Sequence, residues 1–527
     1  MAKLIIQRFN SRILFHAIFL ILFHSGVRAQ VIPVGSVLDE SLRSMQIMGK
    51  IDSSVSFTQR PLYNSSALSI QKAYALIEND TRSVYQKPFR FAGKLGQLSL
   101  LPITFIQQYN THHPYGWNDG SMIPAKGYQT LLTGGFYAAF GPLEIQCQPE
   151  FVYAANKVYE DNGDYGSNSS KAYRKIFAGQ SSLRLSTGSV SVGISTENLW
   201  WGPGRESSLL MSNNAPGFGH IFFKSRKPAQ TPVGSFEWQL IGGKLTADDN
   251  LAYENFNLKP ANLPNDWRYL NAVVLSYQPK WVPGLFVGFT RAIQIYNVDL
   301  DLGSKSILEK YIPVVALAFQ KSNVQDDDAK RRDQLASFFM RWLFAKANAE
   351  FYLEFGFNDY GVNVRDYVMA PTHSAAYLAG LKKIFLLQQP SSRLEFGFEL
   401  TQMSQSPDYL VRDAGNWYVH NQVLQGYTNN NQIMGAGAGL GCNVQSLSAT
   451  WVKGWKQLGV LFERVERDPQ YHVNHWVDFS IGILPQFKYR NMVFSGKFQF
   501  INSNQYAWQK DVNRFNLHSR LSVQYLF

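Results

Sequence analysis

Residues 195 to 216, STENLWWGPGRESSLLMSNNAP, gather side chains whose types suit carbohydrate binding. Trp200 and Trp201 are adjacent indoles, and the C–H faces of a sugar ring stack on such surfaces. The Arg205 guanidinium and the Asn213 and Asn214 amides can satisfy sugar carboxylates and hydroxyls. We therefore predict that this segment binds a glycan and that these five residues contact it.

Other residues that could support catalysis do not form a catalytic pattern. A serine hydrolase needs a Ser and a His held together, and a protease of the acid type needs paired carboxylates. His112 and His113 lie in YNTHHPYGWNDG, whose Gly, Pro and Asn content favours a solvated turn. Asp326 to Asp328 precede KRRD and are interpreted as a charged turn. We predict no enzymatic activity, no metal site and no cofactor.

The elements that must position these residues are strands, because apolar residues recur at every second position. In RLEFGFEL, Leu394, Phe396 and Phe398 share one face and Arg393, Glu395 and Glu399 the other. The segments 143 to 153 and 349 to 357 alternate in the same way. The mean hydropathy is slightly negative although 14% of the residues are aromatic, and no long apolar run follows the N-terminus. This excludes a helical membrane protein.

The lengths of these segments distinguish between the two remaining classes, a soluble β protein and a transmembrane barrel. They run to about 10 to 13 residues, with tight turns at one end and long polar loops at the other, as in outer-membrane barrels. The terminal HSRLSVQYLF alternates and closes on an aromatic residue, Phe527. We predict an all-β transmembrane protein in which residues 93–527 form an antiparallel barrel of 18 strands, because bacterial single-chain barrels carry an even number.

The N-terminal region contains an export signal followed by a small helical segment. Lys3, Arg8 and Arg12 precede an apolar stretch, and Val27-Arg28-Ala29 is a cleavage site before Gln30, so residues 1–29 are the predicted signal peptide. No Cys follows the cut to accept a lipid. Helical spacing over 39–51 and 66–80 predicts that residues 30–92 form a mostly helical periplasmic cap or plug.

Charge and cysteine content indicate the partners. The chain has a formal net charge of +12 and stays basic after the signal is removed. A basic exported protein favours anionic glycans, lipid headgroups or lipopolysaccharide, although solubility alone is an alternative explanation. Cys147 and Cys442 are too few for a disulfide scaffold. We expect an outer-membrane monomer with polysaccharide and lipid partners and no nucleic acid.

The segment that contains Trp200 and Trp201 is a long connection between two strands of the predicted barrel. It follows the hairpin 181–195 and precedes a strand near 218–224. Two interpretations remain open. The tryptophans are membrane-interface aromatics and Gly202-Pro203-Gly204 is only a turn, or the loop folds into the lumen or over its mouth and offers its side chains to a sugar.

The same segment carries a family resemblance. LWWGPG followed by SLLMSNNAPGF resembles the signature loop of the Wzi-type capsule assembly family, and so do HPYGWNDGSMIPAKGYQT (113 to 130) and WYVHNQVLQGYTNNNQIMGAGAG (417 to 439). The resemblance implies an 18-stranded outer-membrane barrel with an N-terminal helical element. It also implies a lectin-like protein that helps to hold exported capsular polysaccharide on the cell surface, without catalysis. The alternative function is a channel or porin, because a barrel this wide has a lumen that can conduct unless it is plugged.

Overall fold

The computed structural model describes residues 30–64, 68–78, 88–92, 95–160, 171–248, 264–302, 304, 306–316, 330–358, 372–389, 391–405 and 415–527. The predicted signal peptide and Asp326 to Asp328 lie outside these residues. No helix in the described part of the chain is long and apolar enough to cross a membrane.

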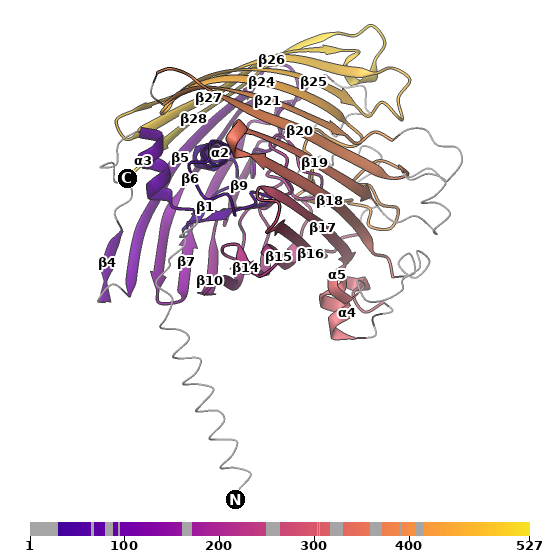
Figure 1. The fold of residues 1–527 in the computed structure, drawn as a ribbon. Coiled ribbons are helices and arrows are strands. Elements are labelled where there is room, and N and C mark those ends of the chain that lie inside the picture. Colours follow the sequence, from indigo (N-terminus) through magenta and orange to yellow (C-terminus); the bar gives the residue numbers. More distant parts are fainter. Residues whose placement is uncertain are drawn as a thin grey trace, which may run out of the picture.

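The wall is a closed antiparallel barrel in which each position pairs with its two neighbours around the ring (Figure 1). Its strands are β4 (Phe89–Phe91), β5 (Gly96–Asn110), β6 (Gly127–Phe140), β7 (Leu143–Cys147), β8 (Glu150–Ala154), β9 (Tyr173–Phe177), β10 (Ser182–Thr187), β11 (Val190–Ser195), β13 (His220–Ser225), β14 (Ala229–Thr231), β15 (Gly234–Leu245), β16 (Arg268–Pro279), β17 (Leu285–Tyr296), β18 (Asp333–Phe344), β19 (Ala349–Asn358), β20 (Ala375–Leu386), β21 (Ser392–Gln402), β24 (Asn443–Lys453), β25 (Lys456–Arg467), β26 (Trp476–Tyr489), β27 (Met492–Asn504) and β28 (Arg514–Tyr525).

The ring closes where β28 pairs with β5, with Val523 opposite Phe105. These 22 strands occupy 18 positions in the wall. Three positions are each filled by two short strands in succession, which are β7 and β8, β9 and β10, and β13 and β14. At a fourth position, β4 and β28 both pair with β5, one after the other. The predicted 18-stranded antiparallel barrel is confirmed.

The alternation of side chains follows the prediction. On β21, Phe396 and Phe398 are each 39% exposed on the outer face, whereas Glu395 and Glu399 are buried inside. Apolar residues face outward because the hydrocarbon of a membrane offers no hydrogen-bond partner, and polar residues inside can pair with one another. The outer face of β28 agrees, since Leu521 and Tyr525 are exposed.

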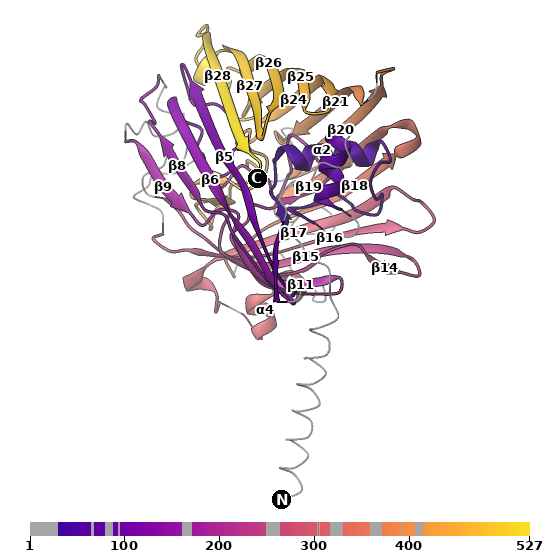
Figure 2. The same ribbon diagram turned by 90° about the vertical axis from the view of Figure 1, so that its left-hand side faces the viewer.

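The two ends of the barrel differ. One end, the short-turn end, carries tight connections such as Gly141 and Gly188, whose φ values of +56° and +55° suit glycine. The other, the long-loop end, carries the connections 111–126, 196–219 and 403–442. The last strand, β28, ends at the short-turn end (Figure 2).

The N-terminal segment packs inside the short-turn end (Figures 1 and 2). It contains α2 (Val37–Ile47), α3 (Ile70–Glu78), β1 (Val31–Ile32), β2 (Gln59–Arg60) and β3 (Leu62–Tyr63). The Ser36 hydroxyl caps α2 by accepting from the Asp39 N–H at 3.3 Å. Leu42 of α2 packs in a cluster that includes Tyr74 of α3 and Trp455 of the wall. Both helices are shorter than the predicted 39–51 and 66–80.

The polar face of α2 contacts inward-pointing residues of the wall. Arg43 Nε donates to Glu350 at 2.9 Å, and the Ser44 hydroxyl donates to Glu395 at 3.0 Å. Arg341 of β18 donates to Gln46 at 2.7 Å and also pairs with Glu350. Because these charges are buried and paired, α2 has a fixed position against β18, β19 and β21.

Candidate functional site

The connection 196–219, here called the plug loop, folds into the lumen and pairs with the N-terminal segment. Its strand β12 (Trp200–Trp201) forms a two-stranded antiparallel ladder with β2, with Trp200 opposite Arg60 and Trp201 opposite Gln59. The loop leaves the wall at the long-loop end and β2 enters from the short-turn end. The ladder therefore joins the two ends inside the barrel.

Both tryptophans of the plug loop are buried. Trp201 is 0% exposed, and its Nε1–H donates to Gln239 Oε1 at 3.2 Å. Trp200 is 3% exposed, with the guanidinium carbon of Arg60 4.5 Å from its ring centroid. Neither indole lies on the outer surface, so the membrane-interface interpretation is wrong. Protein atoms also cover the faces that we predicted would stack on a sugar.

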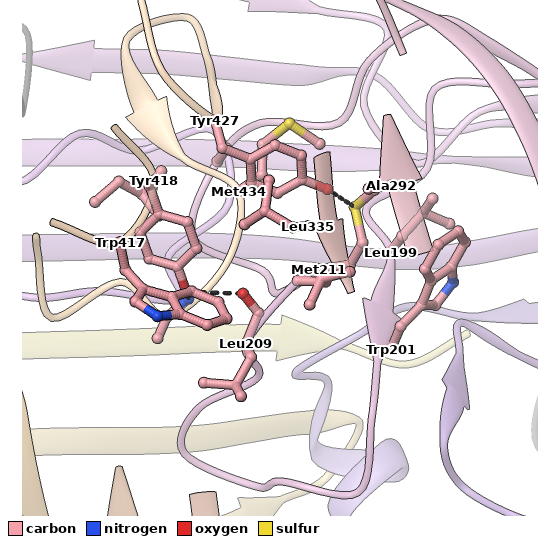
Figure 3. Packing of buried hydrophobic residues seen from close by; sticks show 14 of the residues in the cluster. Leu199, Trp201, Leu209, Met211, Ala292, Leu335, Trp417, Tyr418, Tyr427 and Met434 are labelled. Carbon is pink, nitrogen blue, oxygen red and sulfur yellow. Dashed lines mark hydrogen bonds between the residues drawn. The ribbon is translucent and has the colours of Figure 1, made fainter. Parts of the chain in front are cut away.

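Trp201 belongs to a hydrophobic core that joins the plug loop and the 415–442 loop to wall strands between β13 and β25 (Figure 3). The plug loop contributes Leu209 and Met211, and the wall contributes residues such as Leu335. The loop 415–442 adds Tyr418, whose hydroxyl donates to the Leu209 carbonyl at 2.8 Å, and Tyr427, whose hydroxyl lies 3.7 Å from Met211 Sδ. Close packing of this kind leaves no room for water between these side chains.

The Gly202-Pro203-Gly204 sequence allows a close approach between the loop and its neighbours. Gly202 has φ of +110°, and a Cβ there would lie 2.7 Å from a carboxylate oxygen of Glu354. The Pro203 carbonyl accepts from Arg43 at 2.6 Å, and the Gly204 carbonyl accepts from the same guanidinium at 3.3 Å. A Cβ at Gly204 would lie 1.9 Å from the Ser207 carbonyl oxygen, so packing against the wall and within the loop requires both glycines.

The carboxylate of Glu399 anchors the next turn of the loop. The backbone N–H groups of Arg205 and Ser207 each donate to it at 2.7 Å, and that of Glu206 at 3.1 Å. The Tyr352 hydroxyl also donates to it, at 2.8 Å. A carboxylate that accepts several backbone N–H groups holds a loop tightly, because these donors have no other partner inside the barrel.

The Arg205 side chain is directed toward the N-terminal segment. It forms an ion pair with Glu40 of α2, and Lys382 of the wall lies 2.7 Å from the same carboxylate. Burial lowers the pKa of Arg205, but the adjacent Glu40 carboxylate raises it well above its ordinary value. The side chain is 13% exposed, so it retains limited access to solvent.

Asn213 and Asn214 lie where three loops meet. Asn213 Nδ2 donates to the Asn118 carbonyl at 2.9 Å, and its own carbonyl accepts from the Gly120 N–H at 2.7 Å. Asn214 Nδ2 donates to the Ile433 carbonyl at 2.9 Å. We call this place the three-loop junction, formed by residues 117–120, 212–215 and 429–437. Asn214 is buried, whereas Asn213 is half-buried.

Beside the junction, the inner wall presents two cations near the ring of Trp117, a residue of the junction itself. Lys497 of β27 is the direct cross-strand neighbour of Arg520 of β28. Arg520 Nε lies 3.1 Å from Asp119, and Lys497 Nζ lies 5.8 Å from the ring of Trp117. Within the described residues, no ion pair involves Lys497. Directly opposed like charges are unfavourable, and Asp119 offsets only one of these two positive charges.

A family model described as capsule assembly protein Wzi matches residues 126–513. The chain belongs to the Wzi family of capsule assembly proteins. The matched region contains the plug loop, most of the wall and the 415–442 loop. The expected family resemblance is therefore confirmed. With its apolar outer face and this family, the barrel is an outer-membrane protein.

A solved structure of a capsule assembly barrel shares the fold. It is described as Wzi, an outer-membrane protein involved in group 1 capsule assembly in Escherichia coli and a carbohydrate-binding β-barrel. It superposes with a TM-score of 0.62 at 12% identity, over 94% of this chain and 99% of that chain. OccAB3 of Acinetobacter baumannii gives a TM-score of 0.40 at 11% identity, over 81% and 98% of the two chains. OpdQ of Pseudomonas aeruginosa gives 0.41 at 10%, over 81% and 97%. No curated protein sequence matches.

His113 of this Wzi-family chain is not solvated, which corrects our prediction for this residue. It is 0% exposed and packs against Trp476 of β26 and Tyr506 of the loop between β27 and β28. Burial lowers the pKa of His113 to about 3, so its ring is neutral at physiological pH. His112 is partly exposed and lies 3.4 Å from Glu160. In the ranges that the structure covers, no group of His, Cys, Asp and Glu side chains could hold a metal ion.

Sequence reasoning missed the residues around Asn213. Trp117, Asn118 and Asp119 belong to a block that we identified as similar to the Wzi family, but we assigned them no role. Lys497 and Arg520 point inward in alternating strands, which marks them as luminal. Their proximity, however, depends on the register between β27 and β28, which no local pattern specifies.

Proposed function

We propose that this protein is a lectin-like outer-membrane protein that binds exported capsular polysaccharide and helps to assemble or attach the capsule at the cell surface. Membership of the Wzi family supports a role in capsule assembly. The solved structure of the E. coli Wzi protein is described as a carbohydrate-binding barrel. The observation that carries the proposal is the hydrophobic core that joins the two loops to the wall, because it suits a surface-binding barrel better than a pore.

The glycan contacts are proposed at the three-loop junction. Asn213 is half-buried there and is accompanied by Trp117 and Asn118, which also keep part of their surface exposed. The amide groups can form hydrogen bonds with sugar hydroxyls, and the indole can stack against the face of a sugar ring. The Arg205 guanidinium is directed toward Glu40 of α2 and not toward the junction, so its own contact with sugar requires that ion pair to open. In this proposal Trp200, Trp201 and Asn214 act by holding the loop in shape, and their own contact with sugar requires the loop to open.

The luminal cations favour an acidic glycan. Lys497 and Arg520 oppose each other, and Asp119 pairs with Arg520. A uronic acid or another carboxylated sugar beside Trp117 would place its carboxylate next to Lys497 and Arg520. Because part of this attraction is screened by salt, binding of an acidic glycan weakens as ionic strength rises.

The alternative function, a channel for solutes or oligosaccharides, is disfavoured by the packing of the lumen. The plug loop and the 415–442 loop bury Trp201, Leu209, Tyr418 and Tyr427 in the path between the two ends. We expect the purified barrel to show little single-channel conductance in planar bilayers. Large, steady conductance would support the channel. We propose no catalytic activity.

We also propose that the protein works as a monomer with its wall in contact with outer-membrane lipid and lipopolysaccharide. A single chain closes the barrel through the pairing of β28 with β5, so closure needs no second subunit. Analytical ultracentrifugation in detergent tests this, and a stable dimer would contradict it.

The decisive experiment is deletion of the gene, followed by measurement of cell-bound and shed polysaccharide. We expect total polysaccharide to stay constant while the cell-bound share falls. Complementation with Trp117→Ala or Asn213→Ala should restore less cell-bound polysaccharide per folded barrel than the wild type. Trp281→Ala is the matched control, because Trp281 is 70% exposed at the short-turn end. Full retention by both junction variants would remove the junction from the binding site.

A further inference from the structure

The outer wall carries a groove over β21, β24, β25, β26 and β27. Its volume is about 510 Å³. The apolar side chains that line it are between 39% and 51% exposed and are Phe398, Leu447, Phe462, Phe479, Ile481 and Phe500. The groove is distinct from the luminal site, because these side chains point away from the lumen.

The groove lies in the half of the wall nearest the long-loop end. Phe398 is close to the end of β21 at Gln402, Phe479 is close to the start of β26 at Trp476, and Phe500 is close to the end of β27 at Asn504. A tilted strand of about 10 residues spans the apolar layer, so these positions correspond to one leaflet. Long loops face the cell exterior in bacterial barrels, which makes this the outer leaflet.

Polar side chains border the groove on the side of the long loops. Gln445, Arg464 and Asn502 belong to its lining. Arg464 Nη1 donates to Gln445 Oε1 at 3.0 Å, and Arg464 Nη2 lies 3.3 Å from the Glu466 carboxylate. Glu466 is shared with His475, whose Nδ1 lies 2.9 Å from it. The Arg464 side chain is 34% exposed, and a guanidinium has five N–H donors, so it can take a further acceptor.

We propose that this groove binds an outer-leaflet lipid of the lipid A type, with an acyl chain along the aromatic floor and a headgroup phosphate on Arg464. The apolar floor fits hydrocarbon, and the cation stands where the leaflet becomes polar. Glu466, which also contacts His475, neutralises only part of the Arg464 charge. The lipid thus fixes this side of the wall at the level of the outer headgroups.

The full-length barrel in detergent is titrated with diphosphoryl lipid A, dephosphorylated lipid A or phosphatidylglycerol, and bound lipid is counted by native mass spectrometry. Arg464→Gln should weaken binding of diphosphoryl lipid A about fivefold and leave the dephosphorylated form unchanged. Phe462→Ala should weaken both forms. Phe338→Ala is the control, because Phe338 is 59% exposed at a similar height on β18.

Heat-modifiability of each variant confirms that the barrel is folded before its lipid is counted. Equal binding by all variants would overturn the proposal, and so would an equal loss in Phe338→Ala. Phosphatidylglycerol binding as tight as lipid A would show a general anionic-lipid surface instead. A dimer that forms through this face, detected by cross-linking at Phe462→Cys, would assign the groove to a second copy of the chain.

Discussion

The Arg205 guanidinium of the plug loop forms an ion pair with Glu40 of α2 inside the barrel. A loop that descends from the long-loop end is thereby tied to a helix that enters from the short-turn end. Lys382 of β20 contacts the same carboxylate at 2.7 Å, which attaches both to the wall. The plug loop and the N-terminal segment therefore form one unit, and weakening either one should loosen the other.

The first prediction concerns pH. Burial raises the pKa of Glu40, but Arg205 and Lys382 together lower it below its ordinary value of 4.5. A carboxyl group with a lowered pKa in the folded state stabilises that state above pH 4.5, and this contribution is lost as the pH falls further. We expect limited proteolysis of the N-terminal segment to increase below that pH. Glu40→Gln should already be cleaved faster at neutral pH and should depend less on pH. Identical pH profiles for the two proteins would contradict this.

The second prediction concerns Glu399, which accepts three successive backbone N–H groups of the plug loop. Glu399→Gln replaces one acceptor oxygen by a donor and should destabilise the loop by about 1 to 3 kcal/mol. The measurement is the rate of proteolysis within the loop in the folded barrel. Glu206→Gln is the control, because Glu206 is half-buried and donates only its backbone N–H to this carboxylate. A change of the same size in both variants would show that the effect is only electrostatic.

The third prediction concerns Trp201, which is 0% exposed in the luminal core. Trp201→Ala should cost about 3 to 5 kcal/mol, because it removes buried surface and leaves a cavity. Thermal unfolding in detergent measures this cost, and cell-bound polysaccharide should then fall in proportion to folded protein. If retention per folded barrel falls further while stability is unchanged, Trp201 contacts the glycan itself.

The fourth prediction compares two neighbours on β21. Phe396→Arg places a cation in the lipid and should destabilise by about 2 to 4 kcal/mol. The alternation alone suggests that Glu395→Gln is mild, but Glu395 lies 2.7 Å from the buried Lys382 and 2.6 Å from Arg393. Breaking a buried pair costs about 3 to 5 kcal/mol, so we expect both variants to unfold earlier. A wild-type unfolding temperature for Glu395→Gln would show that water reaches this pair.

The sequence by itself determined the wall. A strand residue faces either lipid or lumen, so the placement of Phe396 and Glu395 follows from a two-residue period that short stretches of sequence reveal. The strand number follows from these segments together with the even number that bacterial barrels carry. The LWWGPG and SNNAP motifs also identified the Wzi family correctly.

Only the tertiary structure decided what the luminal residues do. Trp200 and Trp201 are adjacent and both buried, which no strand period predicts, because their neighbours Arg60 and Gln239 come from distant parts of the chain. The opposition of Lys497 and Arg520 likewise depends on strand register. Inside a closed barrel, loops and helices from both ends compete for one space, and the partner that each buried polar group finds there depends on the packing of the whole chain.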